Sequence, residues 1–217
     1  MTRLILTRHG QTVWNSEKRV QGSLDSPLTE TGLLQTRALA MRLAGEQIGH
    51  IYASHAPRAV STANELARML GLNRIHIAPD LRELSFGEWE GAVWQDLRTA
   101  NPDVFRIWDT TPYLVTPPGG ETMAAVMERA WNCVQQILPL HPDETICLVT
   151  HGLTLHLLVT KALGLEVRDW FQTPRQQNTA LNIFEITGEI WTPKLLGDCA
   201  HLAELDRTPG ESADAKN

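Results

Sequence analysis

Two arginines and two histidines stand just after short apolar runs, in an arrangement suited to chemistry on a phosphoryl group. They are Arg8 and His9 near the amino terminus, Arg58 in the first third of the chain, and His151 further on. The planar guanidinium of arginine donates paired hydrogen bonds to phosphoryl oxygens, and neutral imidazole has a lone pair that can attack phosphorus. With one carboxylic acid to protonate the departing oxygen, these groups suffice for phosphoryl transfer without a metal.

The signatures of several other reactions are absent from the sequence. It contains no phosphate-binding loop G-x-x-x-x-G-K-[ST], no dinucleotide turn G-x-G-x-x-G and no nucleophile elbow G-x-S-x-G. It also lacks the zinc motif H-E-x-x-H, and His151 and His156 are five positions apart, which places them on different faces of a helix. We therefore predict neither a bound metal nor a cofactor.

The composition indicates one globular domain with a sizeable core. The 217 residues are 42% apolar and 20% charged, and the formal net charge is −6. This acidic balance argues against binding to nucleic acid or to an anionic membrane, which basic surfaces drive. No apolar window approaches the roughly 18 residues that a membrane span needs.

The amino terminus and the cysteines together predict a cytoplasmic location. The chain turns polar after Leu6, too early for the apolar stretch of a signal peptide. The three cysteines, Cys133, Cys147 and Cys199, are odd in number and far apart, which argues against a disulfide framework and against a cysteine zinc site.

Apolar periodicity predicts strands that alternate with helices, as in a mostly parallel sheet covered on both faces. Strands are predicted at 4–6, 50–54, 75–77, 145–150 and, as a hairpin, 180–186 and 189–195. Helices are predicted at 30–47, at 122–138 and at 153–163. A further helix is predicted to follow the polar residues 55–58 and to end at about residue 70. Thr29 is the expected cap at the start of the first helix, and Gly71 is expected to end the helix near residue 70.

We therefore predict an α/β fold with three layers, α/β/α, around a mostly parallel central sheet. Residues 1–207 are expected to form a single domain with a helical insertion at about 92–140, and the polar residues 208–217 are expected to be a disordered tail. In such sheets ligands bind beyond the carboxyl ends of the strands. The two arginines and two histidines would meet at that edge.

Five motifs, in this order along the chain, resemble those of the histidine phosphatase superfamily, which is also called phosphoglycerate-mutase-like. They are L-T-R-H-G-Q-T-V-W-N at 6–15, P-L-T-E-T-G at 27–32, R-A-V-S-T-A at 58–63, L-R-E-L-S-F-G-E-W-E-G at 81–91 and T-H-G at 150–152. The resemblance spans residues 3 to 205, and five ordered motifs make an accidental match improbable. One departure is Ala56, where the family more often has leucine.

The resemblance implies a role for each of the central residues. His9 would be the nucleophile that carries the phosphoryl group as phosphohistidine. Arg8, Arg58 and His151 would hold the phosphoryl oxygens. Glu83 would protonate the leaving group and then deprotonate the attacking water.

Four further residues match positions that contact substrate in the family. Asn15 would add a neutral donor to the phosphoryl site, and Gln21 and Gly22 match the loop contacts to substrate. Gly152 follows His151 in the last motif and is predicted to bind substrate with it.

Several of these assignments have competitors in the sequence. Glu88 and Glu90 are as acidic as Glu83, and only the family spacing selects Glu83. His201 could fold back over the site, although an ordinary surface histidine is the favoured interpretation. Arg58 lies at the start of a helix, where a cation is disfavoured, and this placement indicates an anion nearby.

The predicted function is metal-independent hydrolysis of phosphomonoesters of small metabolites, with a mutase of the phosphoglycerate-mutase type as the alternative. The segment 82–87 lacks the N-E-R-H-Y-G form of cofactor-dependent mutases, and the segment 91–120 contains only Arg98 and Arg106 as cations. The chain therefore looks closer to the broad-specificity phosphatase branch. A non-catalytic phosphate-binding protein is disfavoured because both His9 and Glu83 are present.

The leaving group and the oligomeric state stay open at the level of the sequence. Phosphorylated sugars, phosphoglycerates, phosphoserine and nucleotide-derived esters present the same phosphoryl end. The predicted partner is thus a small phosphorylated metabolite.

Overall fold

A computed structural model describes residues 1–203 and 205, and the predicted tail at 208–217 lies outside the described residues. Its centre is a six-stranded sheet in the order β3-β2-β4-β1-β5-β6. The strands are β1 Thr2–Arg8, β2 Ile48–Ala53, β3 His76–Ile77, β4 Thr145–Thr150, β5 Leu181–Thr187 and β6 Ile190–Asp198. The first four strands run parallel, and β5 and β6 form an antiparallel hairpin beside β1. The prediction of a mostly parallel sheet is confirmed.

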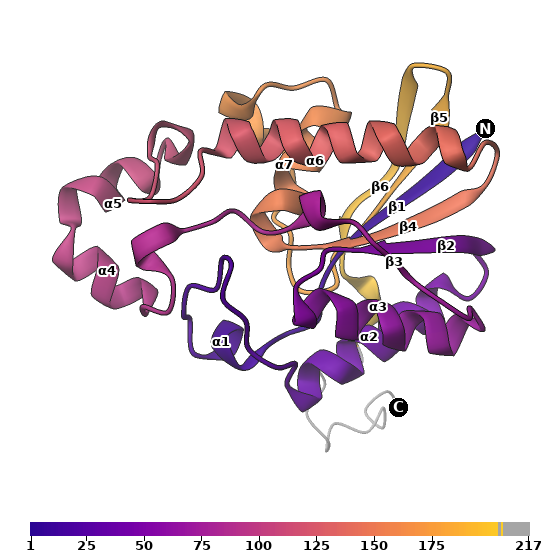
Figure 1. Ribbon diagram of the computed structural model, residues 1–217, viewed down its shortest axis with the longest axis horizontal. Coiled ribbons are helices and arrows are strands. Elements are labelled where there is room, and N and C mark those ends of the chain that lie inside the picture. Colours follow the sequence, from indigo (N-terminus) through magenta and orange to yellow (C-terminus); the bar gives the residue numbers. More distant parts are fainter. Residues whose placement is uncertain (204, 206–217) are drawn as a thin grey trace, which may run out of the picture.

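Helices cover both faces of this sheet, as the sequence predicts (Figure 1). The covering helices are α2 Glu30–Leu43 and α3 Pro57–Leu70 on one face, and α6 Met123–Ile137 and α7 Gly152–Ala162 on the other. Successive side chains along a strand point to opposite faces of the sheet. Leu4 and Leu6 of β1 therefore pack with α6 and α7, whereas Ile5 packs with α2 and α3.

The ends of the helices follow from residues that favour them locally. The hydroxyl of Thr29 accepts a hydrogen bond from the N–H of Gly32 and caps α2. Gly71 ends α3 with a φ of 74°, a left-handed conformation that glycine adopts without strain. Both ends agree with the prediction. β3 is the least regular strand, because only His76 and Ile77 pair with β2.

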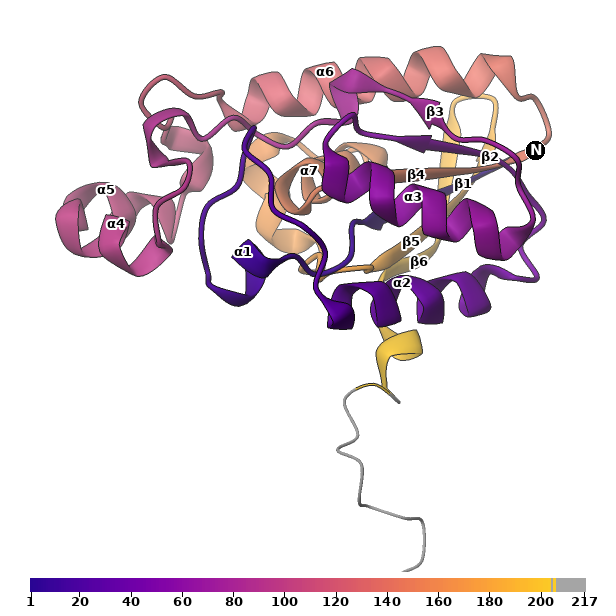
Figure 2. The same cartoon turned by 60° about the horizontal axis from the view of Figure 1, so that its bottom comes forward.

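Part of the segment 92–140 protrudes beyond the carboxyl ends of the strands (Figures 1 and 2). It contains the short helices α4 Trp94–Ala100 and α5 Pro102–Trp108, which pack with Trp89 and Phe105 in an apolar cluster that also includes the first turns of α6 and Leu157 of α7. By contrast, the second half of the segment is α6, whose apolar face is part of the core on the sheet. The part that protrudes is thus shorter than 92–140.

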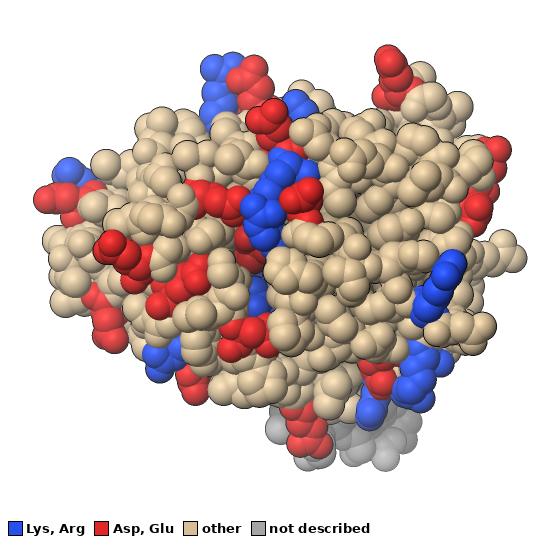
Figure 3. Space-filling model, in the orientation of Figure 1, with Lys and Arg blue, Asp and Glu red and all other residues tan. Residues whose placement is uncertain are grey.

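The surface in Figure 3 carries scattered charges with uncharged side chains between them. The described residues on this face therefore show no continuous basic patch. None of the described helices is both long and apolar enough to span a bilayer.

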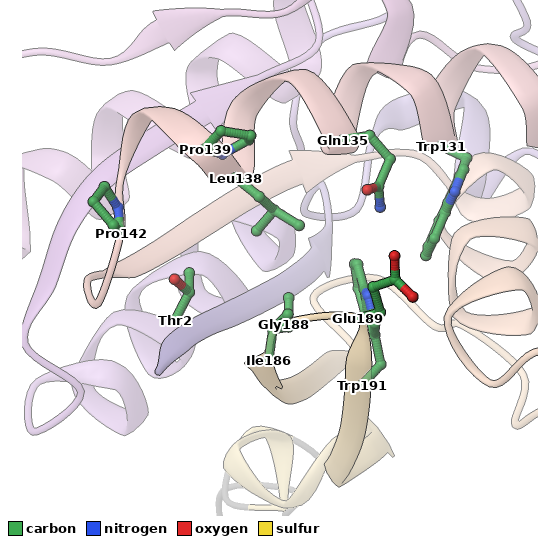
Figure 4. Close-up of a pocket in the computed structure, with 10 residues that line it drawn as sticks. All are labelled: Thr2, Trp131, Gln135, Leu138, Pro139, Pro142, Ile186, Gly188, Glu189 and Trp191. Atoms are coloured by element: carbon green, nitrogen blue, oxygen red, sulfur yellow. The ribbon is translucent and has the colours of Figure 1, made fainter.

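A surface cavity of about 470 Å³ lies between α6 and the β5–β6 hairpin (Figure 4). Its walls include Trp131 and Trp191, whose rings are 4.7 Å apart and continue into the core through Phe184. These two indoles belong to the packing of the hairpin on α6.

Candidate active site

The carboxyl ends of β1, β4 and β2 bring the predicted catalytic segments side by side. Arg8 pairs with Thr150 across β1 and β4, and Ala53 of β2 pairs with Val149. The N–H of His9 continues this pattern by donating to the carbonyl of Thr150, at 3.0 Å. Residues that follow these three strands must therefore converge at one edge of the sheet.

A cavity of about 240 Å³ opens at this edge. Eight of the nine predicted site residues line it: Arg8, His9, Asn15, Gln21, Gly22, Arg58, Glu83 and Gly152. The ninth, His151, is fully buried, and its ring packs edge-on against that of His9 with 5.3 Å between the ring centroids. The structure thus brings the whole predicted set together.

His9 is held as a neutral imidazole. Burial lowers its pKa well below 6.5, and the nearby Arg8 and Arg58 lower it further. Its Nδ1 lies 2.8 Å from the carbonyl oxygen of Gly10 and must donate, because a carbonyl only accepts. The lone pair of the neutral ring is therefore on Nε2. This is the state that a nucleophile needs at neutral pH.

The two arginines are held mainly through their terminal nitrogens. Nη1 of Arg58 lies 2.7 Å from the carboxylate of Asp25, and Nη2 donates to the carbonyl of Gly22 at 2.8 Å. The anion expected near this helix start is thus Asp25, from the protein itself. Nη1 of Arg8 donates to the carbonyl of Gln176, at 3.1 Å. Burial lowers the pKa of Arg8 to about 10, so it stays protonated at neutral pH.

His151 is anchored from the neighbouring strand. Its Nε2 lies 2.7 Å from the hydroxyl of Ser54, which follows β2. Burial lowers the pKa of His151 well below 6.5, and Arg58 and His9 act in the same direction. Like His9, it is neutral at pH 7.

Three site residues have buried nitrogens without a partner. Among the described residues, five buried side-chain nitrogens make no hydrogen bond, and three of them are Nε of Arg8, Nε of Arg58 and Nδ1 of His151. Buried polar groups in folded proteins are nearly always paired, and an unpaired one is costly. Their concentration around His9 marks a place built to receive acceptor oxygens.

The carboxylate of Glu83 is fixed at the first turn of α7. It accepts hydrogen bonds from the backbone N–H groups of Leu84, Leu153 and Thr154 at 3.0 to 3.2 Å. These bonds hold Glu83 at the wall of the cavity that contains His9.

The two competing glutamates have other surroundings. Glu88 is exposed. Glu90 accepts from the backbone N–H groups of Ser23 and Phe86, both at 2.9 Å, and so ties two loops together. Of these three glutamates, only Glu83 lines the cavity that contains His9, so the geometry favours the predicted choice of Glu83.

The predicted substrate-binding residues also shape the site. Gly22 has a φ of 57°, and its carbonyl holds Arg58. A Cβ on Gly152 would lie 3.3 Å from Cζ of Arg8, so glycine allows the guanidinium to approach the start of α7 closely. The side-chain oxygen of Asn15 accepts from the N–H of Thr12 and from Asn178, and Gln21 is buried.

His201 is bound at a different place. Its Nε2 lies 3.0 Å from the hydroxyl of Thr179, and the short turn that contains it packs against α2. His201 does not line the cavity that contains His9, but it is half-buried and so is not the ordinary surface histidine that the sequence favours.

The far wall of the cavity comes in part from the protruding helices, since α4 contributes Trp94 and α5 contributes Trp108. Phe86, Trp94, Trp108 and Leu153 give it an apolar surface, and Arg19 adds a cation. The side chain of Arg19 is already engaged by Glu17 and by the carbonyl of Gly91.

Three supporting residues escape sequence reasoning. Asp25 and Ser54 hold Arg58 and His151, as described above. Arg129 of α6 donates to the carbonyls of Asp80, Arg82 and Glu83 and forms an ion pair with Glu121, and it thereby anchors the segment that carries Glu83. The contacts of Asp25 with Arg58, of Arg129 with Glu83 and of Ser54 with His151 join residues 33 to 97 positions apart, so no local pattern could indicate them.

Comparison with known proteins agrees with this geometry. A family model described as the histidine phosphatase superfamily (branch 1) matches residues 4–199. The chain is 33% identical to phosphoglycerate mutase-like protein 4 of Arabidopsis thaliana, with 95% of this chain and 94% of the relative covered. It is 29% identical to the metal-independent phosphoserine phosphatase of the same plant, with 94% and 85% covered.

A solved structure gives the same result at the level of the fold. The mycobacterial glucosyl-3-phosphoglycerate phosphatase in complex with VO3 has a TM-score of 0.84 and 29% identity, with 91% of this chain and 99% of that chain covered. Relatives that are named phosphatases support a phosphatase. The match over nearly the whole chain confirms the resemblance of the five motifs, and this protein belongs to the histidine phosphatase superfamily.

Proposed function

We propose that this protein hydrolyses phosphomonoesters of small metabolites without a metal ion, through a phosphohistidine intermediate on His9. The observation that carries the proposal is the set of unpaired buried nitrogens on Arg8, Arg58 and His151 around a neutral His9. These donors match the oxygens of a phosphoryl group, whose negative charge the two arginines would neutralise.

In the first step, Nε2 of His9 attacks phosphorus and the ester P–O bond breaks. Glu83, protonated at that moment, gives its proton to the departing oxygen. The product alcohol leaves, and the phosphoryl group remains on His9, held by Arg8, Arg58 and His151. Hydrogen bonds from Asn15 would complete the set of contacts.

In the second step, water attacks the phosphorus of phosphohistidine. Glu83, now a carboxylate, takes the proton from this water, the P–N bond breaks, and inorganic phosphate is released. His9 returns to its neutral form, and Glu83 is again protonated for the next cycle. No step requires a metal ion.

The chemistry of the cavity wall favours hydrolysis over mutase activity. A mutase must hold a second anionic group, whereas the wall beyond the arginines of the site is mainly apolar and its remaining cation, Arg19, is engaged. A phosphoglycerate-mutase-type transferase stays the alternative, because one Arabidopsis relative is named phosphoglycerate mutase-like protein 4.

A cytoplasmic location is part of the proposal. Cys133 and Cys147 are free thiols. Burial raises the pKa of Cys147 to about 12 and that of Cys133 to about 11, so both stay protonated at neutral pH. Unpaired thiols of this kind suit a reducing compartment.

The test is a panel of phosphomonoesters offered to enzyme treated with EDTA. We expect release of inorganic phosphate from phosphoserine, phosphoglycerates or sugar phosphates at the rate of the untreated enzyme. Loss of activity in EDTA that Mg²⁺ or Zn²⁺ restores would overturn the metal-independent mechanism. Interconversion of phosphoglycerates without release of phosphate would favour the mutase.

A further inference from the structure

A second cluster of reactive side chains lies at the end of the sheet opposite the active site. His50 is in the first half of β2, and His141 and Glu144 directly precede β4. This end of β2 and β4 faces away from the protruding helices α4 and α5 (Figure 1). The cluster is therefore separate from the cavity that contains His9.

The three side chains are arranged as ligands of a metal ion would be. One potential ligand atom from each of His50, His141 and Glu144 lies within 4.8 Å of the others, and among the described residues this is the one group of three such side chains that meets this condition. The two imidazole rings lie with 3.7 Å between centroids and are tilted by 31°, and Nε2 of His50 lies 2.9 Å from the carboxylate of Glu144.

The donor set is typical of zinc. Zn²⁺ accepts imidazole nitrogen and carboxylate oxygen at about 2.0–2.2 Å in a tetrahedral arrangement, so modest side-chain rotations would let all three donors reach one ion. Two histidines and a carboxylate suit Zn²⁺ better than Mg²⁺ or Ca²⁺, which prefer oxygen ligands alone. Water would take the fourth position.

A neighbouring hydroxyl orients one of these three side chains, and solvent reaches the other two. The hydroxyl of Tyr52 lies 2.7 Å from Nε2 of His141 and fixes the orientation of that ring, as outer-shell partners do at metal sites. The side chains of His50 and Glu144 are 26% and 45% exposed, so an ion can reach them from solvent.

We propose that His50, His141 and Glu144 form a zinc-binding site that is separate from the phosphatase site. The ion would join β2 to the start of β4, two strands that are neighbours in the sheet. Because it binds the folded protein, zinc would stabilise the fold. It would take no part in hydrolysis.

The test uses the untagged full-length protein after removal of metals with EDTA, followed by dialysis. Titration calorimetry with Zn²⁺ should give one site per chain, and Tm should rise when Zn²⁺ is added. The substitutions His50→Ala and Glu144→Ala, both at partly exposed side chains, should each weaken binding at least tenfold. The matched controls His55→Ala and Glu88→Ala, at exposed positions elsewhere, should bind as the wild type does.

A further variant separates this site from the active site. His9→Ala should keep the zinc site, and Tyr52→Phe should weaken binding about 10- to 100-fold because it removes the outer-shell hydroxyl. Absence of Zn²⁺ binding by the wild type would overturn the proposal. So would binding that His9→Ala abolishes but His50→Ala and Glu144→Ala leave unchanged.

Discussion

His9, Glu83 and the group of Arg8, Arg58 and His151 have different surroundings in the site. His9 is kept neutral by burial and by the adjacent arginines, whereas Glu83 is held by backbone N–H groups at the start of α7. The arginines and His151 supply donors that have no other partner. In this account a nucleophile, an acid and an anion-binding site are separate groups, so each can be altered by itself.

At the residue scale, the first prediction concerns Glu83. The substitution Glu83→Gln should slow hydrolysis of an alkyl phosphate by about 10²–10⁴-fold, because general acid catalysis contributes this much. An aryl phosphate with a good leaving group needs little protonation, and its phosphorylation step should lose much less. Rates of the first turnover, measured by rapid mixing, provide the comparison.

The control for this prediction is Glu88→Gln, at an exposed glutamate of the same segment. It should leave both substrates nearly unaffected. Equal losses with the alkyl and the aryl phosphate in the first turnover of Glu83→Gln would contradict its role as the acid. A selective loss in Glu88→Gln would transfer that role to Glu88.

At the scale of elements, the site depends on how α6 holds the segment before it. The guanidinium of Arg129 donates hydrogen bonds to three backbone carbonyls and to the carboxylate of Glu121. Glu121 in turn accepts a hydrogen bond from the N–H of Ser85. These bonds stand in for a regular strand or helix in a segment that contains only short 3-10 turns. α6 thus acts as a positioning element for Glu83.

The second prediction follows from this anchor. Arg129→Met should reduce kcat for an alkyl phosphate by about 10- to 100-fold, since small displacements of a catalytic group cost this much. An aryl phosphate should lose less, as it does in Glu83→Gln, and KM should change little. The variant should also be less stable by about 3 kcal/mol, because Glu121 loses its partly buried partner.

The control here is Arg82→Met, which removes a more exposed partner of Glu121. Surface ion pairs contribute little, so both rates should stay within about twofold of the wild type. If Arg129→Met slowed the alkyl and aryl substrates equally, its effect would be on the fold alone. Steady-state kinetics with both substrates decide between these outcomes.

The elements that local patterns encode were predictable, and the contacts between distant segments were not. The four helices on the sheet, both hairpin strands and the strand at 145–150 follow from periodicity, caps and turn residues. Arg8, His9, Arg58 and His151 were indicated by polar residues that follow predicted strands, whereas Glu83 was selected only by the resemblance to the family. Arg129 and Asp25 act through tertiary contacts, and the grouping of His50 with His141 depends on the pairing of β2 with β4. A single sequence carries no local signal for such contacts.

At the scale of the whole molecule, buried neutral histidines make the stability depend on pH. Burial lowers the pKa of His9 and His151 well below 6.5, whereas in the unfolded chain a histidine titrates near 6.5. Below about pH 6.5 the unfolded chain therefore binds protons that the folded protein does not. By linkage, the free energy of unfolding must fall as the pH falls through this range.

The third prediction concerns the size of this pH dependence of the free energy of unfolding. Between pH 7.5 and 5.5, each of these two histidines should lower the free energy of unfolding by on the order of 1 kcal/mol. Urea unfolding in buffers without phosphate measures it, since phosphate would bind the site and stabilise the fold. His9→Gln should lose about that share of the pH dependence. A stability that is constant or higher at pH 5.5 would contradict the burial of neutral imidazoles.

The central claim is that His9 carries the phosphoryl group, and the most direct measurement is to trap it. Turnover of a phosphomonoester labelled at phosphorus is stopped without acid, and the labelled peptide is identified by mass spectrometry. We predict one acid-labile, base-stable phosphoryl group on the peptide that contains His9. His9→Ala should abolish both label and turnover, whereas His151→Ala should slow turnover and leave any residual label on His9. A label on His151, or substantial activity in His9→Ala, would contradict the mechanism.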